Sequence, residues 1–316
     1  MTVAREASVQ AKTPAKTGVS KAKKREYSWG LLFLSPWLLG FLFFTGLPIL
    51  ATLYYSFTDY NLVKPDEIKL IGLTNYQRML TDPQVAQSMG VTIKFALIAV
   101  PLGLIIPLTF AVLVNSKHLV GSNFFRTLFF MPTIIPVVAA VMVFQGVLNA
   151  QSGWINLALG ALGIEGPRWL SDPAWALWAL NLIGLWGVGN SMLILLAALQ
   201  GVPTELYEAA IVDGASAPQR FFNITVPMIS PVIFYNLTLG VIYAFQYFVV
   251  AMLVGGRNGD PQGATMFYNL NLYRTAFVFN EMGYAGALAW TLFIIVMVLT
   301  VLLFTVGQRF VYYASD

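Results

Sequence analysis

Long uninterrupted apolar stretches dominate the hydrophobic pattern of this chain. Six stretches contain no Asp, Glu, Lys or Arg, and each is at least as long as a typical membrane-spanning helix. A helix rises about 1.5 Å per residue, so a hydrocarbon core of about 30 Å needs roughly 20 apolar residues. We predict one membrane helix in each stretch, at residues 27–58, 95–116, 127–164, 173–204, 221–256 and 282–308.

Turn-forming residues and prolines interrupt several of these stretches. In the third stretch, Gln151, Ser152 and Gly153 predict a loop after Asn149. Proline removes a backbone donor and favours a kink, and in lipid such a break persists where neighbouring protein satisfies the backbone. The kinks are compatible either with ordinary helix packing or with helices that surround a passage. The prolines concerned are Pro101, Pro107, Pro132, Pro136, Pro227 and Pro231.

Composition supports a membrane protein and excludes several other classes. Hydrophobic residues make up 58% of the 316 residues and charged residues only 10%, with a mean hydropathy of +0.71. A soluble domain carries about 25% charged residues, so these values exclude a soluble globule, a disordered chain, collagen and a coiled coil. The chain has no cysteine and one histidine, His118, which excludes a disulfide framework, a thiolate zinc site, a cysteine nucleophile and a multi-histidine metal site. We expect no metal ligand and no catalytic residue. The net charge of +4 is concentrated near the N-terminus and does not indicate nucleic-acid binding.

Basic residues predict the orientation of the chain in the membrane. Lys21, Lys23, Lys24 and Arg25 precede the first apolar stretch, and such clusters stay on the cytoplasmic side. That stretch is too long for a cleaved signal peptide. We therefore expect both termini in the cytoplasm and the loops 58–88, 150–172 and 255–281 outside. The expected parts are a disordered basic tail at 1–28, a first membrane helix at 29–57, an outer loop at 58–87, a core with five membrane helices at 88–310 and a cytoplasmic tail at 311–316.

The inner loop near residues 203–226 predicts a rigid pair of helices. Pro203 and Thr204 favour a helix start, and Gly214 favours a left-handed helix end. Ser216 with Gln219 forms a capping box, which predicts a second helix that runs toward Pro227. Leu206, Ala209 and Ala210 follow the spacing of one helix face. Such a unit is either a connector that lies on the surface or a docking element for a soluble partner.

The sequence of this loop resembles the EAA signature of ABC-importer permeases. Glu208-Ala209-Ala210 is followed by Gly214, Ile224 and Val226-Pro227 at the spacing of that signature, with Val226 in place of leucine. Further segments resemble the carbohydrate branch, notably the first permease of each sugar-system pair. The chain inserts residues 257–260 before Pro261 and has no large outer domain such as that of the maltose-system subunit. The resembling segments are Ser35-Pro36 with Pro48, residues 55–61, residues 71–76, Phe125-Arg126-Thr127 with Pro132, and Gly153-Trp154-Ile155-Asn156.

The resemblance implies an all-helical membrane protein with the type I ABC importer permease fold and six transmembrane helices. It implies a bacterial or archaeal cell membrane, a second permease subunit, two cytoplasmic ATPase subunits that use ATP and Mg²⁺, and an extracytoplasmic sugar-binding protein. The chain lacks a phosphate-binding Gly-x-x-x-x-Gly-Lys-Ser/Thr loop, so it is expected to be a non-catalytic subunit without a cofactor. The residues expected to couple to the ATPase are Glu205, Glu208, Ala209, Ala210, Asp213, Gly214 and Pro227.

Polar and aromatic residues in the fourth and fifth stretches are candidates for a sugar pathway. Amides hydrogen-bond to sugar hydroxyls, and aromatic rings stack on apolar sugar faces. Asn236, Gly240, Tyr243 and Tyr247 follow helical steps of four, three and four residues, which predicts that they form a single stripe on one helix face. Gln246 lies beside this stripe. The alternative is that these side chains pack against other helices or against the partner permease. The candidates are Trp186, Gly187, Asn190, Asn236, Gly240, Tyr243, Gln246 and Tyr247.

Other function classes fit the sequence less well. An ion-coupled secondary transporter usually keeps an ionisable residue at membrane depth, and Lys94, the nearest candidate, lies at the edge of the second stretch. A membrane-embedded enzyme needs clustered His, Asp or Glu, whereas the acids here lie in loops. An amino-acid or peptide ABC permease is the nearest alternative within the family.

Overall fold

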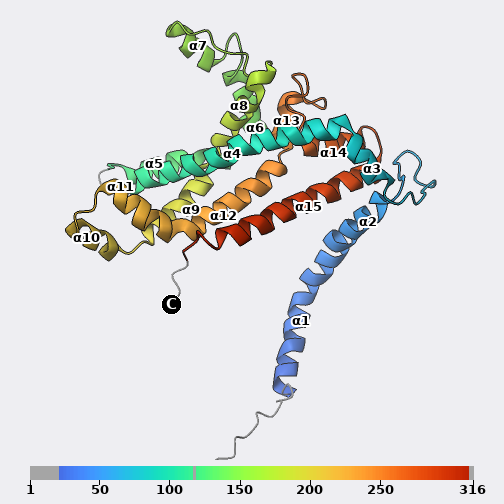
Figure 1. Cartoon of the computed structure of the whole chain (residues 1–316), viewed down its shortest axis with the longest axis horizontal. Helices are drawn as coiled ribbons and strands as arrows, with labels where there is room; N and C mark the ends of the chain where they lie inside the picture. The colour runs from blue at the N-terminus through green and yellow to red at the C-terminus, as the bar shows by residue number, and fades with distance from the viewer. Residues whose placement is uncertain (1–20, 117–118, 313–316) are drawn as a thin grey trace, which may run out of the picture. The chain divides into compact units, whose positions relative to one another are not determined.

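The computed structural model describes residues 21–116 and 119–312, with side chains from residue 25 onward. In these residues every regular element is helical, apart from one isolated bridge between Thr58 and Leu70 (Figure 1). The terminal residues 1–20 and 313–316, which were expected to form tails, and His118 lie outside the described residues. Backbone contacts divide the chain into two units, one up to Thr52 and one from Leu53 onward.

The first unit consists of one long apolar helix. It comprises α1 (Lys21–Phe41), a π-helical turn (Leu42–Gly46) and α2 (Leu47–Ser56), whose last residues belong to the second unit. The helix is already present at Lys21, eight residues before the predicted start at residue 29, because Lys, Ala and Arg are good helix formers. None of the apolar window within residues 25–56 is buried inside the protein. A helix of that length and composition can cross a membrane, as predicted.

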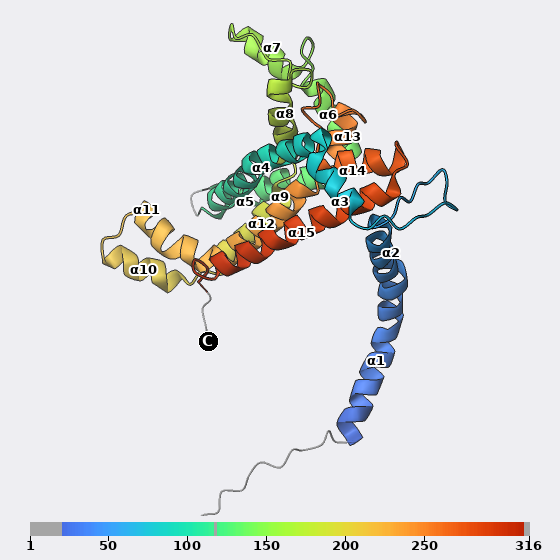
Figure 2. The ribbon, with the colours of Figure 1, turned by 45° about the vertical axis from the view of Figure 1, so that its right-hand side comes forward.

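The second unit is a bundle of long helices that lie side by side (Figures 1 and 2). α4 (Pro83–Asn115) contacts both α9 (Gly189–Gln200) and α12 (Val226–Phe245), and α12 also contacts α15 (Met282–Gly307). Small and branched apolar residues fill the centre of this bundle and are fully or almost fully buried. One core cluster consists of Ala111, Val114, Met192, Leu195, Leu196, Leu199, Val202 and Ile229.

Three of the predicted membrane helices are not straight. α5 (Ser122–Phe130) with a short 3₁₀ turn (Met131–Ile134) meets α6 (Val137–Val147) at a bend of 102°, which follows from Pro136 at the break. α8 (Pro173–Leu185) meets α9 at 54°, with residues 186–188 between them. In the fifth stretch, α12 ends at Phe245 and α13 (Val249–Gly255) starts after a break. The described residues thus contain four continuous candidate spans, and six if each of the two bent pairs counts as one.

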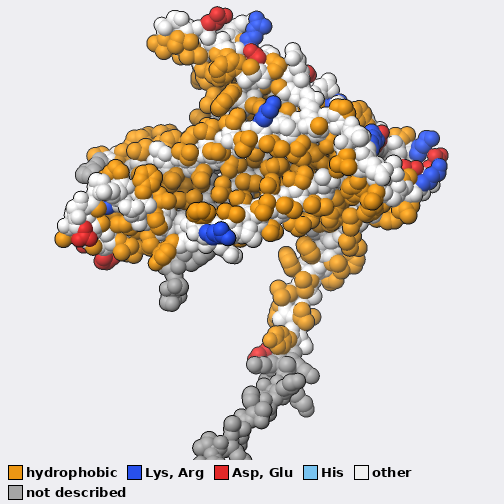
Figure 3. Space-filling model, viewed as in Figure 1, with side chains coloured by type: hydrophobic (Ala, Val, Ile, Leu, Met, Phe, Trp, Pro, Cys, Tyr) orange, Lys and Arg blue, Asp and Glu red, His pale blue; other side chains and the backbone are white. Residues whose placement is uncertain are grey.

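Short helices occupy the two ends of the bundle. α10 (Thr204–Val212) and α11 (Ala217–Arg220) lie at one end, whereas α3 (Thr74–Thr81), α13 and α14 (Tyr268–Phe277) lie at the other (Figure 1). α7 (Trp154–Ala161) is at the tip of a lobe formed with α6 and α8 (Figure 2). Hydrophobic side chains cover the visible face over α4, α12 and α15, and acidic side chains gather toward the ends (Figure 3).

Polar contacts hold together the end that contains α3. Asn75 Nδ2 donates hydrogen bonds to the carbonyl oxygens of Ser56 and Thr58 at 2.9 and 2.8 Å. Arg78 forms an ion pair of 2.8 Å with Glu281, which directly precedes α15. The predicted outer loop is therefore fixed to the start of α15 through contacts between residues far apart in the sequence.

Candidate functional site

The predicted helical pair forms what we call the α10–α11 hairpin, residues 203–225. α10 begins at Thr204 and carries Glu205 in its first turn, where the negative charge interacts favourably with the positive end of the helix dipole. Its end is a Schellman motif, in which the amide of Ala215 donates to the carbonyl of Ala210 at 2.8 Å and that of Gly214 donates to Ile211 at 3.0 Å. Gly214 has φ +77°, a left-handed conformation that glycine adopts without steric cost. The glycine stop predicted from the sequence is confirmed.

The return helix begins with the predicted capping box. The Ser216 amide donates to Gln219 Oε1 at 2.7 Å, and the Ser216 hydroxyl donates to the same oxygen at 2.9 Å. α11 passes through a single π-helical segment (Phe221–Thr225) into α12 without a loop. Residues 217–245 therefore form one continuous helix of 29 residues that meets the criteria for a membrane span. The second arm of the hairpin is the end of that span.

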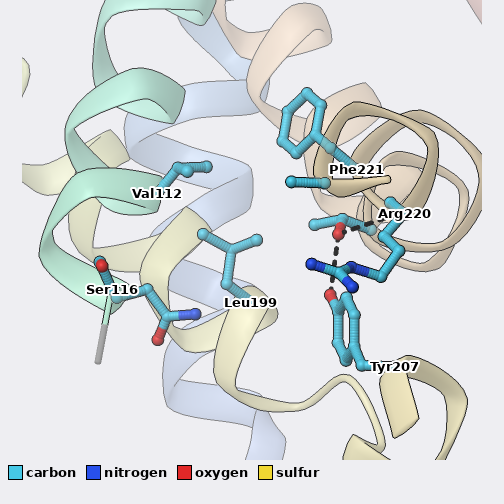
Figure 4. A pocket seen from close by; sticks show the side chains of 9 residues that line it. Val112, Ser116, Leu199, Tyr207, Arg220 and Phe221 are labelled. Carbon is cyan, nitrogen blue, oxygen red and sulfur yellow. Dashed lines mark hydrogen bonds between the residues drawn. The ribbon is translucent and has the colours of Figure 1, made fainter. Parts of the chain in front are cut away.

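Side-chain hydrogen bonds brace the two arms of the hairpin. The hydroxyls of Tyr207, on α10, and Thr225 lie 2.8 Å apart. Arg220 Nη1 donates to the carbonyl of Ala215 at 3.3 Å. These groups border a cavity of about 440 Å³ between the hairpin, α4 and α9 (Figure 4). The cavity is lined by Val112, Asn115, Ser116, Leu199, Tyr207, Ala217, Arg220, Phe221 and Thr225.

The brace was missed in the sequence analysis. Tyr207 is half-buried, whereas the conspicuous Glu208 and Ala209 are exposed, and no local motif pairs Tyr207 with a threonine 18 residues later. The only available signal was the position of one aromatic residue between two acids. Ala210, which was grouped with Leu206 and Ala209, is half-buried on the Tyr207 side, whereas Leu206 and Ala209 are exposed.

The outward side of α10 mixes apolar and acidic side chains. Val212 is 87% exposed, and Leu206 and Ile211 are also exposed. The acidic side chains Glu205, Glu208 and Asp213 share this exposed surface. Pro227 lies apart from it, half-buried in the first turn of α12. The structure therefore places six of the seven predicted coupling residues on α10 and its glycine turn, and the seventh on the membrane helix.

The predicted stripe on the fifth membrane helix is interrupted. Asn236, Gly240 and Tyr243 lie on α12, where Tyr243 is 65% exposed and Asn236 Nδ2 donates to the Val232 carbonyl at 2.9 Å. The expectation that Tyr247 continues the stripe is wrong, because α12 ends at Phe245 and residues 246–248 are not helical.

Tyr247 instead packs into the core at the break between α12 and α13. Its ring centroid lies 4.3 Å from that of Phe95 and 4.9 Å from that of Phe267. Its hydroxyl is buried and has no hydrogen-bond partner among the residues that the structure describes. Gln246, the neighbouring candidate, is exposed. The break therefore turns one candidate outward and the next one inward.

The candidates in the fourth membrane segment also lie at a break. Trp186 and Gly187 fall in the non-helical residues between α8 and α9, and Asn190 is exposed in the first turn of α9. The Trp186 ring centroid is 5.6 Å from that of Phe144 on α6. The next residue of α6, Gln145, donates from Nε2 to the Leu253 carbonyl on α13 at 3.1 Å. α6 thus contacts both the first break, at Trp186, and α13, the helix that follows the second break.

Ionisable residues do not form a metal-binding cluster within the described chain. No group of three His, Cys, Asp or Glu side chains in residues 21–116 and 119–312 could hold a metal ion. Lys94 is exposed on the side of α4.

Comparisons with known proteins agree with the all-helical membrane fold. The family model described as binding-protein-dependent transport system inner membrane component matches residues 99–313. A probable ABC transporter permease of Bacillus subtilis (strain 168) is 40% identical over 94% of this chain and 96% of its own length. The trehalose/maltose transport system permease protein MalF of Thermococcus litoralis is 32% identical over 92% of this chain and 97% of its own length.

A solved structure extends the likeness to the whole fold. A bacterial ABC transporter involved in the import of the acidic polysaccharide alginate contains a chain with a TM-score of 0.76 and 20% identity. The alignment covers 92% of this chain and 98% of that chain. At this level of identity the likeness concerns the fold, which is that of an ABC importer permease.

Proposed function

Since the chain belongs to the family of binding-protein-dependent transport system inner membrane components, we propose that it is the permease subunit of an ATP-driven sugar importer. Relatives at 30% identity or more include permeases named for trehalose/maltose and for arabinooligosaccharides, which supports a carbohydrate as cargo. In this proposal the chain lines half of the passage and a second permease subunit lines the other half. An extracytoplasmic binding protein delivers the sugar, and two ATPase subunits supply the energy.

One observation carries the proposed coupling role, namely the continuity of the α10–α11 hairpin with α12. A force on α10 passes through the Gly214 turn and the Tyr207–Thr225 brace into a helix that crosses the membrane. A flexible loop in that place would absorb the displacement. The exposed mixture of Leu206, Ile211, Val212 and acidic side chains gives an ATPase subunit both apolar area and charge to recognise.

The orientation of the protein follows from the same role. ATPase subunits are cytoplasmic, so the hairpin faces the cytoplasm and the opposite end, with α3 and α14, faces outward. Both termini then lie in the cytoplasm, in agreement with the basic residues before the first span. ATP and Mg²⁺ belong to the partner subunits, and this chain acts as a non-catalytic gate.

The two helix breaks are the proposed sugar pathway. Non-helical backbone at membrane depth persists where it is buried in protein or lines a water-filled cavity, and broken helices mark substrate sites in other transporters. Trp186 and Tyr243 expose aromatic surface for stacking, while Asn190 and Gln246 expose amides. The buried Tyr247 hydroxyl, which has no partner in residues 21–116 and 119–312, becomes available to a sugar hydroxyl if the break opens.

Uptake by proteoliposomes tests this function. The complete complex, reconstituted with its second permease and ATPase subunits, should accumulate sugar only when ATP and binding protein are supplied. A complex with an ATPase subunit inactivated in its phosphate-binding loop is the matched control and should not accumulate sugar. Uptake that follows an ion gradient in vesicles lacking any ATPase subunit would contradict the proposal.

The substitution Tyr243→Ala tests the pathway separately. The loss of one exposed stacking surface should raise the sugar concentration needed for half-maximal uptake, because stacking contributes to binding. The ATPase activity without sugar should stay unchanged, since Tyr243 is remote from the hairpin. Tyr235→Ala, another exposed tyrosine of α12, is the matched control.

A further inference from the structure

The short helix α7 exposes a continuous apolar face. Trp154, Leu157, Ala158, Ala161 and Leu162 are all exposed and follow the spacing i, i+3, i+4, i+7 and i+8. Trp154 is 76% and Leu157 58% exposed. Hydrophobic side chains gather at this tip in the space-filling view (Figure 3). The helix contains no charged residue, and its only polar side chain, Asn156, is on the opposite face.

Hydrogen bonds hold this face outward. Asn156 Nδ2 donates to the carbonyls of Ala150 and Pro167, both at 3.0 Å, and Asn156 Oδ1 accepts from Trp169 Nε1 at 2.7 Å. Ile155, on the same inward side, packs against the main core cluster. Asn156 therefore ties α7 to the segments on both sides of it. The helix cannot rotate its apolar face inward without breaking these bonds.

We propose that α7 is an interfacial helix, whose apolar face lies in the lipid surface of the membrane. The loop that contains α7 joins α6 and α8, which belong to the two bent membrane spans, so α7 starts and ends beside lipid. Tryptophan is enriched at the membrane–water interface, and an apolar helix face buries at the boundary of headgroups and acyl chains. The first charged residues after α7, Glu165 and Arg168, lie in the following loop and face water or headgroups.

Protein docking is a poorer explanation for this face. Protein–protein interfaces carry about one hydrogen bond per 100–200 Å² and have a polar rim. The outward side chains of α7 offer one hydrogen-bond donor, the indole N–H of Trp154, and no acceptor. The α10 surface, by contrast, combines apolar and acidic groups. The inference goes beyond the proposed function, because it needs only that the chain crosses the membrane and does not depend on ATP, sugar or the coupling role.

Single-cysteine labelling tests the proposal cleanly, because the chain has no native cysteine. The variants Leu157→Cys and Ala158→Cys would be spin-labelled in the complete complex, in vesicles of phosphatidylethanolamine and phosphatidylglycerol. We expect labels at both positions to be accessible to oxygen, which concentrates in lipid, and shielded from a water-soluble nickel chelate. Glu165→Cys, exposed in the following loop, is the matched control and should show the reverse.

Two outcomes would overturn the proposal. Labels on α7 that meet the nickel chelate as readily as the Glu165→Cys label would show that the face lies in water. Labels shielded from both oxygen and nickel would show that a protein surface, rather than lipid, covers α7. Use of two adjacent positions keeps the test decisive if one variant does not fold. A complex that fails to transport sugar still yields the depth result, so the two proposals can fail independently.

Discussion

Two short helices of this protein, α10 and α7, are built alike and expose different surfaces. Each ends in a Schellman motif with glycine in the left-handed conformation, Gly214 at φ +77° and Gly163 at φ +75°. Each is held by a side chain on its inward face, Tyr207 in α10 and Asn156 in α7. The outward face of α10 mixes acids with apolar residues, whereas that of α7 is purely apolar. If the two proposals hold, outward chemistry rather than local fold decides whether such a helix meets a protein or a lipid partner.

Substitution of valine for the glycines that end α10 and α7 should reveal the largest functional difference between the two helices. A left-handed conformation costs a non-glycine residue about 1–2 kcal/mol, enough to change the population of a folded hairpin roughly five- to thirty-fold. Gly214→Val should therefore reduce ATPase association and sugar uptake by about tenfold. Both would be measured in purified complexes by co-purification and by vesicle uptake.

Gly163→Val is the matched control for this substitution. It introduces the same backbone strain at the end of α7, where an added Cβ also meets no other atom. It should leave ATPase association unchanged. Gly214→Asn should retain part of the activity, because asparagine tolerates the left-handed conformation. Equal loss of association in the two valine variants would remove the distinction drawn between the helices.

Charge reversal on the outward faces should have the next largest effect. Glu208→Lys places a cation on the mixed surface of α10, and we expect the affinity for the ATPase to fall about tenfold, or ~1.4 kcal/mol. Glu165→Lys, beside α7, should leave that affinity unchanged. Binding would be measured by titrating ATPase subunits onto the permease pair at two salt concentrations. An unchanged affinity in Glu208→Lys would show that the acidic part of the surface is not recognised.

Removal of the brace should have the smallest effect. Tyr207→Phe deletes one hydrogen bond, worth about 0.5–1.5 kcal/mol, and leaves Thr225 without its hydroxyl partner. Hydrogen–deuterium exchange of the hairpin amides should accelerate several-fold, and uptake should fall modestly. Tyr235→Phe on α12 is the control and should change neither quantity. Unchanged exchange in Tyr207→Phe would mean that the backbone caps alone keep the hairpin rigid.

Local signals in the sequence predicted much of the hairpin and of the membrane helices. Gly214 and the Ser216–Gln219 capping box determine the conformation of only the few backbone residues next to them, so the helix end and the helix start could be predicted from the sequence. Charge-free stretches located the membrane helices because a hydrocarbon core excludes charge along a known length. The proline pair at 132 and 136 predicted a kink, although its size of 102° depends on packing.

Features that depend on contacts distant in sequence could not be predicted. The break at residues 186–188 contains no proline that could have predicted it. Tyr247 leaves the predicted stripe because α12 ends at Phe245 and the Tyr247 ring packs against Phe95 and Phe267. The Tyr207–Thr225 brace joins two elements whose approach no local motif encodes. The sequence analysis predicted only a loop between two spans at the position of α7, so the outward face of this helix was not predicted.

The accessibility of Val212 tests the central claim most directly. This residue is the most exposed large apolar residue described on α10, and Val212→Cys would be the only cysteine in the chain. A membrane-impermeant maleimide should label it in inside-out vesicles stripped of ATPase, fail to label it in intact cells, and be blocked when ATPase subunits are added back. Labelling from outside intact cells, or labelling indifferent to the ATPase, would contradict the account.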